Sequence, residues 1–185
     1  MDYITIASAG NTHDFGDLSK HGDSPGAAGN STRALIGGAL TQTPSAVPLA
    51  DISFVTIPTL GDNVDFGGDL TVARWSCFAV ASTTRTVWAG GSTPSRQSVI
   101  DYGFISSLGN AINFGDLTTN SASCPASSNC IRGVFAGGYR DPNNHASSDI
   151  DYIQIATEGN SVDFGDLSVQ NDAGGAGVSN GHGGL

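Results

Sequence analysis

The chain has 185 residues, of which 38% are hydrophobic, and its 17 acidic and 7 basic side chains give a net charge of −10. This charge disfavours binding to nucleic acid and to anionic membranes, and no apolar run approaches the roughly 20 residues of a membrane helix. The chain length favours one domain over residues 1–185. We also expect no nucleic-acid partner, no membrane insertion and no visible signal peptide.

One pattern recurs along the chain, in copies that begin near residues 2, 53, 101 and 151. In the first copy, Tyr3, Thr5 and Ala7 alternate with isoleucines, which predicts a strand. Gly10-Asn11 then favours a tight turn, and the chain reverses into a strand that ends Asp-Phe-Gly-Asp-Leu. The equivalent phenylalanines of the copies are Phe15, Phe66, Phe114 and Phe164. A repeat of about fifty residues indicates one supersecondary unit copied along the chain.

Two further strands are predicted between these copies. A run of small residues follows each repeat leucine, and an arginine that opens an apolar strand ending in Gly-Gly comes next. The arginines are Arg33, Arg85 and Arg132, with His182 at the fourth position. Polar segments of variable length follow at residues 41–50, 92–98 and 139–149. Each repeat therefore holds four strands, and its variable loops are the expected recognition surface.

This arrangement resembles the kelch type of β-propeller blade. The sequence pattern of the repeat resembles kelch-like repeats of marine bacteriophage proteins, especially cyanophage proteins described as tail-fibre-like. The residues that carry this resemblance are Asp-Tyr-Ile-x-Ile-Ala-x-x-Gly-Asn-x-x-Asp-Phe-Gly-Asp-Leu and Arg-Gly-Val-Phe-Ala-Gly-Gly-Tyr. The resemblance implies a non-enzymatic virion protein that binds other virion proteins or a host surface protein or glycan. A lectin-like or scaffold propeller of cellular origin is the alternative function, and a hydrolase built on a propeller is a third hypothesis.

The expected fold is an all-β propeller of four four-stranded blades. The chain begins at the third strand of a repeat and ends at Gly183-Gly184-Leu185, after the second, so pairing of the N- and C-terminal strands would complete the fourth blade. A monomeric ring is favoured, because small inner residues suit a tight four-bladed ring. A homodimer sharing a larger ring and a fibrous β-solenoid are the alternatives.

Recurring charges are interpreted mainly as structural. Asp17, Asp116 and Asp166 each belong to a pair of polar side chains around a glycine, where capping of turns is favoured over binding of Ca²⁺. The repeat arginines are expected to pair with an aspartate of an adjacent strand, and an axial ring of arginines that traps an anion is the alternative. No other cofactor and no metal site are expected.

Ligand contacts are expected at Trp75, Tyr139, Arg140 and His145, which lie in or beside turns and variable loops. Trp88 fits core packing instead. The four histidines show no metal-ligand spacing, and no nucleophile elbow or phosphate-binding loop is present, so no enzyme activity is predicted. Cys124 and Cys130 lie symmetrically about an expected turn at Ser127. Small buried thiols are the favoured interpretation, and a disulfide across this hairpin is the alternative.

Overall fold

The computed structural model describes residues 1–20, 22–42, 44–142, 145–172 and 175–178, with only the backbone of His145. Its regular structure is almost entirely strands, and the one helical turn in the described residues is the short 3-10 helix η1 (Ile57–Thr59). The predicted all-β fold is therefore confirmed.

The strands form an N-terminal hairpin and three antiparallel units. The hairpin pairs β1 (Asp2–Tyr3) with β2 (His13–Asp14). Unit 1 comprises β3 (Gly26–Gly29), β4 (Arg33–Thr41), β5 (Val47–Thr56) and β6 (Val64–Asp69). Unit 2 comprises β7 (Phe78–Ala81), β8 (Arg85–Ala89), β9 (Gln97–Phe104) and β10 (Ile112–Ala122). Unit 3 comprises β11 (Ala126–Ser128), β12 (Arg132–Ala136), β14 (His145–Gln154) and β15 (Val162–Asn171), and the short β13 (Tyr139–Arg140) joins β10 to β14.

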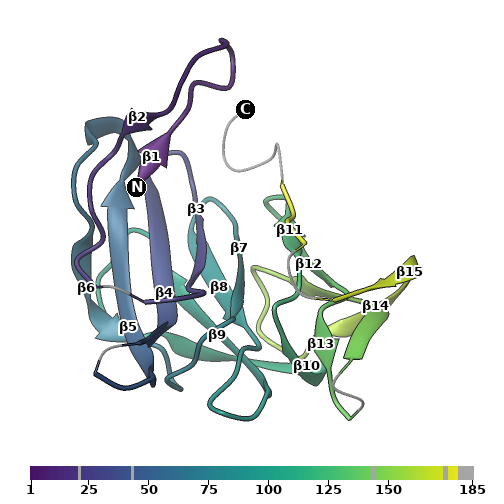
Figure 1. Cartoon of the computed structure of the whole chain (residues 1–185). Helices are drawn as coiled ribbons and strands as arrows, with labels where there is room; N and C mark the ends of the chain where they lie inside the picture. Colours follow the sequence, from purple (N-terminus) through teal and green to yellow (C-terminus); the bar gives the residue numbers. More distant parts are fainter. Residues whose placement is uncertain (21, 43, 143–144, 173–174, 179–185) are drawn as a thin grey trace.

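Each unit has the predicted strand sequence: a small-residue strand, the arginine strand, the aromatic strand and the Phe-Gly strand. Consecutive strands pair antiparallel, as the predicted hairpins require. Figure 1 shows the units following one another, with unit 1 on the left, unit 2 in the middle and unit 3 on the right. The described parts of the β4–β5, β8–β9 and β13–β14 connections, which belong to the variable segments, lie along the lower edge of this view.

The core lies between neighbouring units. One buried cluster combines Leu35 and Phe66 of unit 1 with Trp88 and Ile105 of the unit 2 repeat, and a second combines residues of units 2 and 3 around Phe135. Trp88 is fully buried, and its indole Nε1 donates a hydrogen bond to the carbonyl of Gly26 at 3.1 Å. This confirms the core-packing interpretation of Trp88. The apolar faces that meet at the two junctions between units are thus buried, as in stacked repeats.

The Phe-Gly strand of one unit also bonds to the glycine turn of the next. Gly159 N–H donates to Phe114 O at 2.8 Å, and Asp116 N–H donates to the side chain of Asn160 at 3.0 Å. A Cβ on Gly115 would lie 2.4 Å from Gly159 O, closer than real Cβ contacts come, so the backbones meet only because a glycine is present. Equivalent contacts join Phe15 and Asp17, which follow β2, to Gly61 and Asp62, and join β6 to Asn110.

Expectations about the ring closure and the cysteine hairpin need correction or stay untested. The described residues contain three four-stranded units, and β1 pairs with β2 alone. Of the expected closing segment, residues 175–178 are described and are not assigned to a strand, whereas residues 173–174 and 179–185, with His182, lie outside the described part of the chain. The structure forms no Cys124–Cys130 disulfide. The buried-thiol interpretation is confirmed for Cys124, whereas Cys130 is exposed. Ser128 pairs with Gly133, so the hairpin turns around Cys130 itself and not at Ser127.

Candidate functional site

The predicted ligand residues do not form one site. Trp75 and Tyr139 are half-buried, and Trp75 pairs with Ser92 through the backbone. Arg140 is buried, with its guanidinium on Asp151, so it lies inside unit 3 and away from any surface ligand. The side chain of His145 lies outside the described part of the chain.

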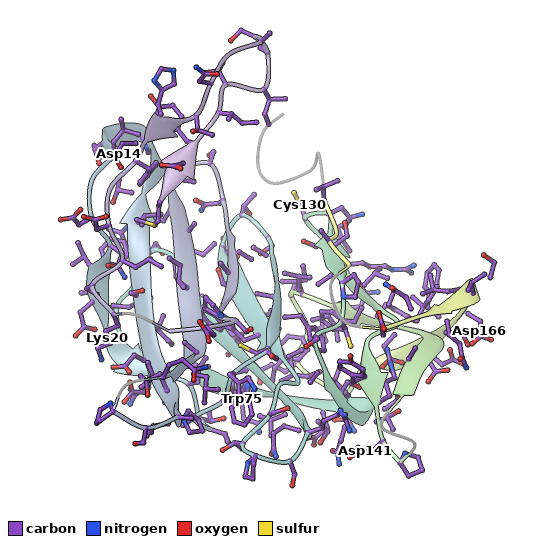
Figure 2. All side chains as sticks on the ribbon, in the orientation of Figure 1. Asp14, Lys20, Trp75, Cys130, Asp141 and Asp166 are labelled. Atoms are coloured by element: carbon purple, nitrogen blue, oxygen red, sulfur yellow. The ribbon has the colours of Figure 1, made fainter. Side chains whose placement is uncertain are left out.

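Loops of units 2 and 3 meet beside Tyr139. The guanidinium of Arg96 lies 5.6 Å from the Tyr139 ring centre and 2.9 Å from the carboxylate of Asp141, which also accepts a hydrogen bond from Asn120 at 3.2 Å. Figure 2 shows Trp75 and Asp141 near the same lower edge. We call Trp75, Arg96, Tyr139 and Asp141 the loop cluster.

The repeat arginines were expected to pair with aspartates, and this is corrected by the structure. Each guanidinium lies over an aromatic ring: Arg33 over Phe54 at 4.7 Å, Arg85 over Tyr102 at 4.4 Å and Arg132 over Tyr152 at 5.0 Å. Arg33 also donates to Ile105 O of the next repeat, and Arg85 donates to Ile155 O, both at 3.2 Å. The aromatic face supplies the attraction that a carboxylate was expected to supply.

The recurring aspartates accept local hydrogen bonds. Asp14, Asp65 and Asp163 each accept the N–H of the residue two positions on, at 2.8 to 3.0 Å. Asp116 accepts from the Ser98 hydroxyl at 2.9 Å, and Asp166 accepts from the Ser148 hydroxyl at 3.2 Å. Asp17 donates its backbone N–H to Asp62 at 2.8 Å. Within the described residues no three His, Cys, Asp or Glu side chains are grouped as metal ligands.

Sequence analysis missed two buried ion pairs. In unit 2, Arg74 Nη1 lies 2.8 Å from Asp101 Oδ2, and both side chains are fully buried. Thr71 donates to the other oxygen of Asp101 at 2.6 Å, and Arg74 also donates to the carbonyls of Val72 and Trp88. Every oxygen of this carboxylate therefore has a donor, which is what makes a buried charge tolerable.

Unit 3 contains an equivalent buried ion pair, but its arginine occupies a different position of the repeat. Arg140 Nη1 lies 2.7 Å from Asp151 Oδ2, and Thr118 donates to both oxygens of Asp151 at 2.9 Å. Arg140 donates in addition to Gly137 O at 3.3 Å and to Asp149 O at 3.2 Å. Arg74 precedes its unit, whereas Arg140 follows the Gly-Gly of its own unit, so the two arginines that pair with equivalent carboxylates come from different positions of the repeat. The signal in the sequence is the Asp-Tyr pair Asp101-Tyr102 and Asp151-Tyr152, where an acid interrupts a buried strand.

Unit 1 lacks this pair. Ser53 stands opposite Asp65, as Asp101 stands opposite Asn113 and Asp151 opposite Asp163, so Ser53 takes the place of the aspartate. Gly22 and Thr41 take the places of the two arginines. Gly22 lies four residues after Leu18, as Arg74 does after Leu70, and Thr41 pairs with Val47 as Arg140 pairs with His145.

A pocket of about 250 Å³ lies in this part of unit 1. Its lining includes Ser19, Gly22, Gly38, Ser53 and Asn63. Apolar groups of Leu18, Ile36, Ala39, Leu49 and Ile52 line the rest, together with Pro25, Asp51, Asp65 and Lys20. The ammonium of Lys20 pairs with Asp51, and both side chains are partly exposed. We call this the unit 1 pocket and take it as the candidate binding site.

The two buried cysteines, Cys77 and Cys124, have environments that disfavour the thiolate. Burial raises the pKa of the Cys124 thiol to about 12, and burial also raises the pKa of Cys77. Their thiols contact backbone carbonyls, Cys124 that of Gly137 at 3.1 Å and Cys77 that of Gly37 at 3.4 Å. A raised pKa disfavours the reactive thiolate, so these two groups serve packing.

Comparison with known proteins found no matching family model and no matching curated protein. Among the described residues no helix has the length and apolar character needed to cross a membrane.

Proposed function

We propose that this chain is a non-enzymatic structural or adhesion module of a virion, built as a four-bladed β-propeller of kelch-like blades. It presents its loops to a host surface protein or glycan, or to a neighbouring virion protein. The resemblance of the repeats supports the virion assignment, and the three stacked four-stranded units support the propeller.

Closure of the ring is supported by the contrast between inner and end positions. Phe66 and Phe114 are 1% and 3% exposed, but the equivalent Phe164 at the unit 3 end is 55% exposed. Ile105 and Ile155 are 2% and 0% exposed, whereas the equivalent Ile6 of the hairpin is 95% exposed. Each end of the stack therefore exposes one of the two apolar surfaces that bury each other at the inner junctions.

The segment 175–178 supports closure by the chain itself. Ser127 Oγ donates to Val178 O at 2.7 Å, which places this segment beside the small-residue strand β11 of unit 3. The inner units make a similar contact, because Ser128 Oγ donates to Ala81 O of β7 at 3.0 Å. Segment 175–178 thus begins where the first strand of a fourth blade belongs.

The loop cluster is the observation that carries the binding proposal. Two loops of different units are tied together by the Arg96–Asp141 pair, and aromatic side chains lie in and beside them. Aromatic side chains with a polar rim are typical anchors for a sugar ring or a protein partner.

Purified protein should bind cyanobacterial cells or a class of sugars on a glycan array, and antibodies against it should label phage particles. The variants Trp75→Ala and Tyr139→Ala should weaken binding tenfold or more, if each anchor contributes about 1.4 kcal/mol or more. Leu108→Ala, an exposed apolar residue at the opposite end of β9, is the control and should bind as the parent does. Loss of binding in the control, or labelling of host cytoplasm without particles, would contradict the proposal.

A further inference from the structure

The unit 1 pocket lies where the other two units each hold a guanidinium. The backbone carbonyls of Val72, Trp88, Gly137 and Asp149 accept hydrogen bonds from Arg74 or Arg140. Their equivalents in unit 1 are Lys20, Ile36, Gly38 and Asp51, and all four line the pocket.

Sequence spacing and strand register establish these equivalences. Lys20 lies two residues after Leu18, as Val72 does after Leu70. Ile36 pairs with Ser53 as Trp88 pairs with Asp101. Asp51 pairs with Asp69 as Asp149 pairs with Asp166. Gly38 and Gly137 share a left-handed backbone, with φ of 68° and 62°. The acceptor positions that hold a guanidinium are thus kept in unit 1, whereas the arginine that would fill them is missing.

The charge around the pocket favours a cation. Asp51 and Asp65 both line it, and Lys20 is the one cationic side chain among its described lining residues. The chain as a whole carries a charge of −10, which attracts cations toward such a pocket. Ser19 and Ser53 add hydroxyl oxygens at the positions of Thr71 and Asp101. In unit 2 Thr71 donates to Asp101, and Asp101 pairs with Arg74.

We propose that the unit 1 pocket binds a guanidinium group, supplied by free arginine or by an arginine side chain of a partner protein. The bound group takes the place that Arg74 and Arg140 hold in the other units and competes with Lys20 for Asp51. This site is separate from the loop cluster, so it does not depend on the proposed adhesion function.

Titration with N-acetyl-L-arginine methylamide, followed by amide chemical shifts, tests the proposal. Guanidinium chloride at low millimolar concentration is the second probe, and sodium chloride at equal ionic strength is the control. We expect saturable shifts at pocket residues with both guanidinium compounds and none with sodium. Free arginine and a short arginine-containing peptide, titrated in parallel, distinguish the two sources, the tighter binder being the better mimic of the natural ligand. Shifts that never saturate, or that fall outside the pocket, would overturn the proposal.

Three variants sharpen the test. Lys20→Gln releases Asp51 at an exposed position and should tighten binding severalfold. Ser53→Asp supplies the carboxylate of the other units and should tighten it roughly tenfold or more, because hydrogen bonds to charged groups are the stronger ones. Thr41→Arg combined with Ser53→Asp installs the unit 3 pair and should abolish binding while the fold is kept.

Ser45→Asp adds the same charge on the exposed β4–β5 connection and serves as the matched control. Its affinity should stay within about twofold of the parent, because screened surface charges contribute little. If Ser53→Asp does not fold, Lys20→Gln still decides the question, since the proposal requires tighter binding by that variant. Undiminished binding by the folded Thr41→Arg, Ser53→Asp protein would place the ligand elsewhere.

Discussion

Asp101 and Ser53 occupy equivalent positions in neighbouring units, but the charged side chains around them differ. Asp101 has Arg74 and Thr71 as donors, whereas Ser53 has neither arginine and lines a pocket. Acid and base are thus present together or absent together, because a buried carboxylate without a cation is strongly destabilising.

Replacing Arg74 with Met should therefore cost about 3–5 kcal/mol, since it leaves the Asp101 carboxylate buried without its cation. The double variant Arg74→Met, Asp101→Ser reproduces the neutral pairing of unit 1 and should recover at least half of that loss. Urea unfolding gives both free energies. Equal losses for the single and double variants would show that packing of the arginine stem, and not charge, matters at this position.

The thiols provide a second prediction for single residues. Cys130 is exposed, whereas Cys77 and Cys124 are buried. The pKa of Cys124 is raised to about 12. Its thiolate is therefore scarce at a solution pH of about 8.5, where an ordinary thiol is half ionised. A thiol reagent at mildly alkaline pH should label one cysteine in the folded protein and three in denaturant, with mass spectrometry identifying Cys130 as the first. Early labelling of Cys124 would contradict the buried core between units 2 and 3.

At the scale of the strands, local patterns were sufficient for prediction and distant partners were not. The alternation of apolar and polar residues and the glycine turns both depend on residues that are close in sequence, so the four strands of each unit could be predicted. The aromatic partners of Arg33 and Arg85 lie on the adjacent strand in a register that the sequence does not show. The unit 1 pocket was harder still, because it exists through the absence of an arginine at Gly22 and Thr41.

The contact between the Phe-Gly strand and the next turn can be tested with two glycines of unit 2. Gly115 and Gly109 both have a left-handed φ, of 152° and 135°. A Cβ on Gly115 would collide with Gly159, whereas a Cβ on Gly109 meets nothing within 4 Å. Gly115→Ala should therefore lose about 1–3 kcal/mol more stability than Gly109→Ala, by the usual cost of overpacking. Similar losses in urea unfolding would mean that backbone strain alone is responsible.

For the whole molecule, the decisive feature is the exposure of the two ends of the stack. Hydrophobic burial between units is the main stabilising contribution in such a stack, and an exposed end forfeits it. Phe164 at one end and Ile6 at the other are both exposed, and their equivalents inside the stack are buried. The Gly10-Asn11 turn of the hairpin matches the turn that each inner Phe-Gly strand meets, so the hairpin has the right residues to cover unit 3.

Gly165 is equivalent to Gly115, and in the described arrangement a Cβ added to it meets nothing within 4 Å. In a closed ring the Gly10-Asn11 turn would cover it, so Gly165→Ala should lose as much stability as Gly115→Ala. In a single-chain ring this loss is independent of protein concentration, and native mass spectrometry shows one chain of 18.7 kDa. A ring shared by two chains would give twice that mass and a loss that grows on dilution. If Gly165→Ala instead behaves like Gly109→Ala at every concentration, the ends do not meet and the closed propeller is wrong.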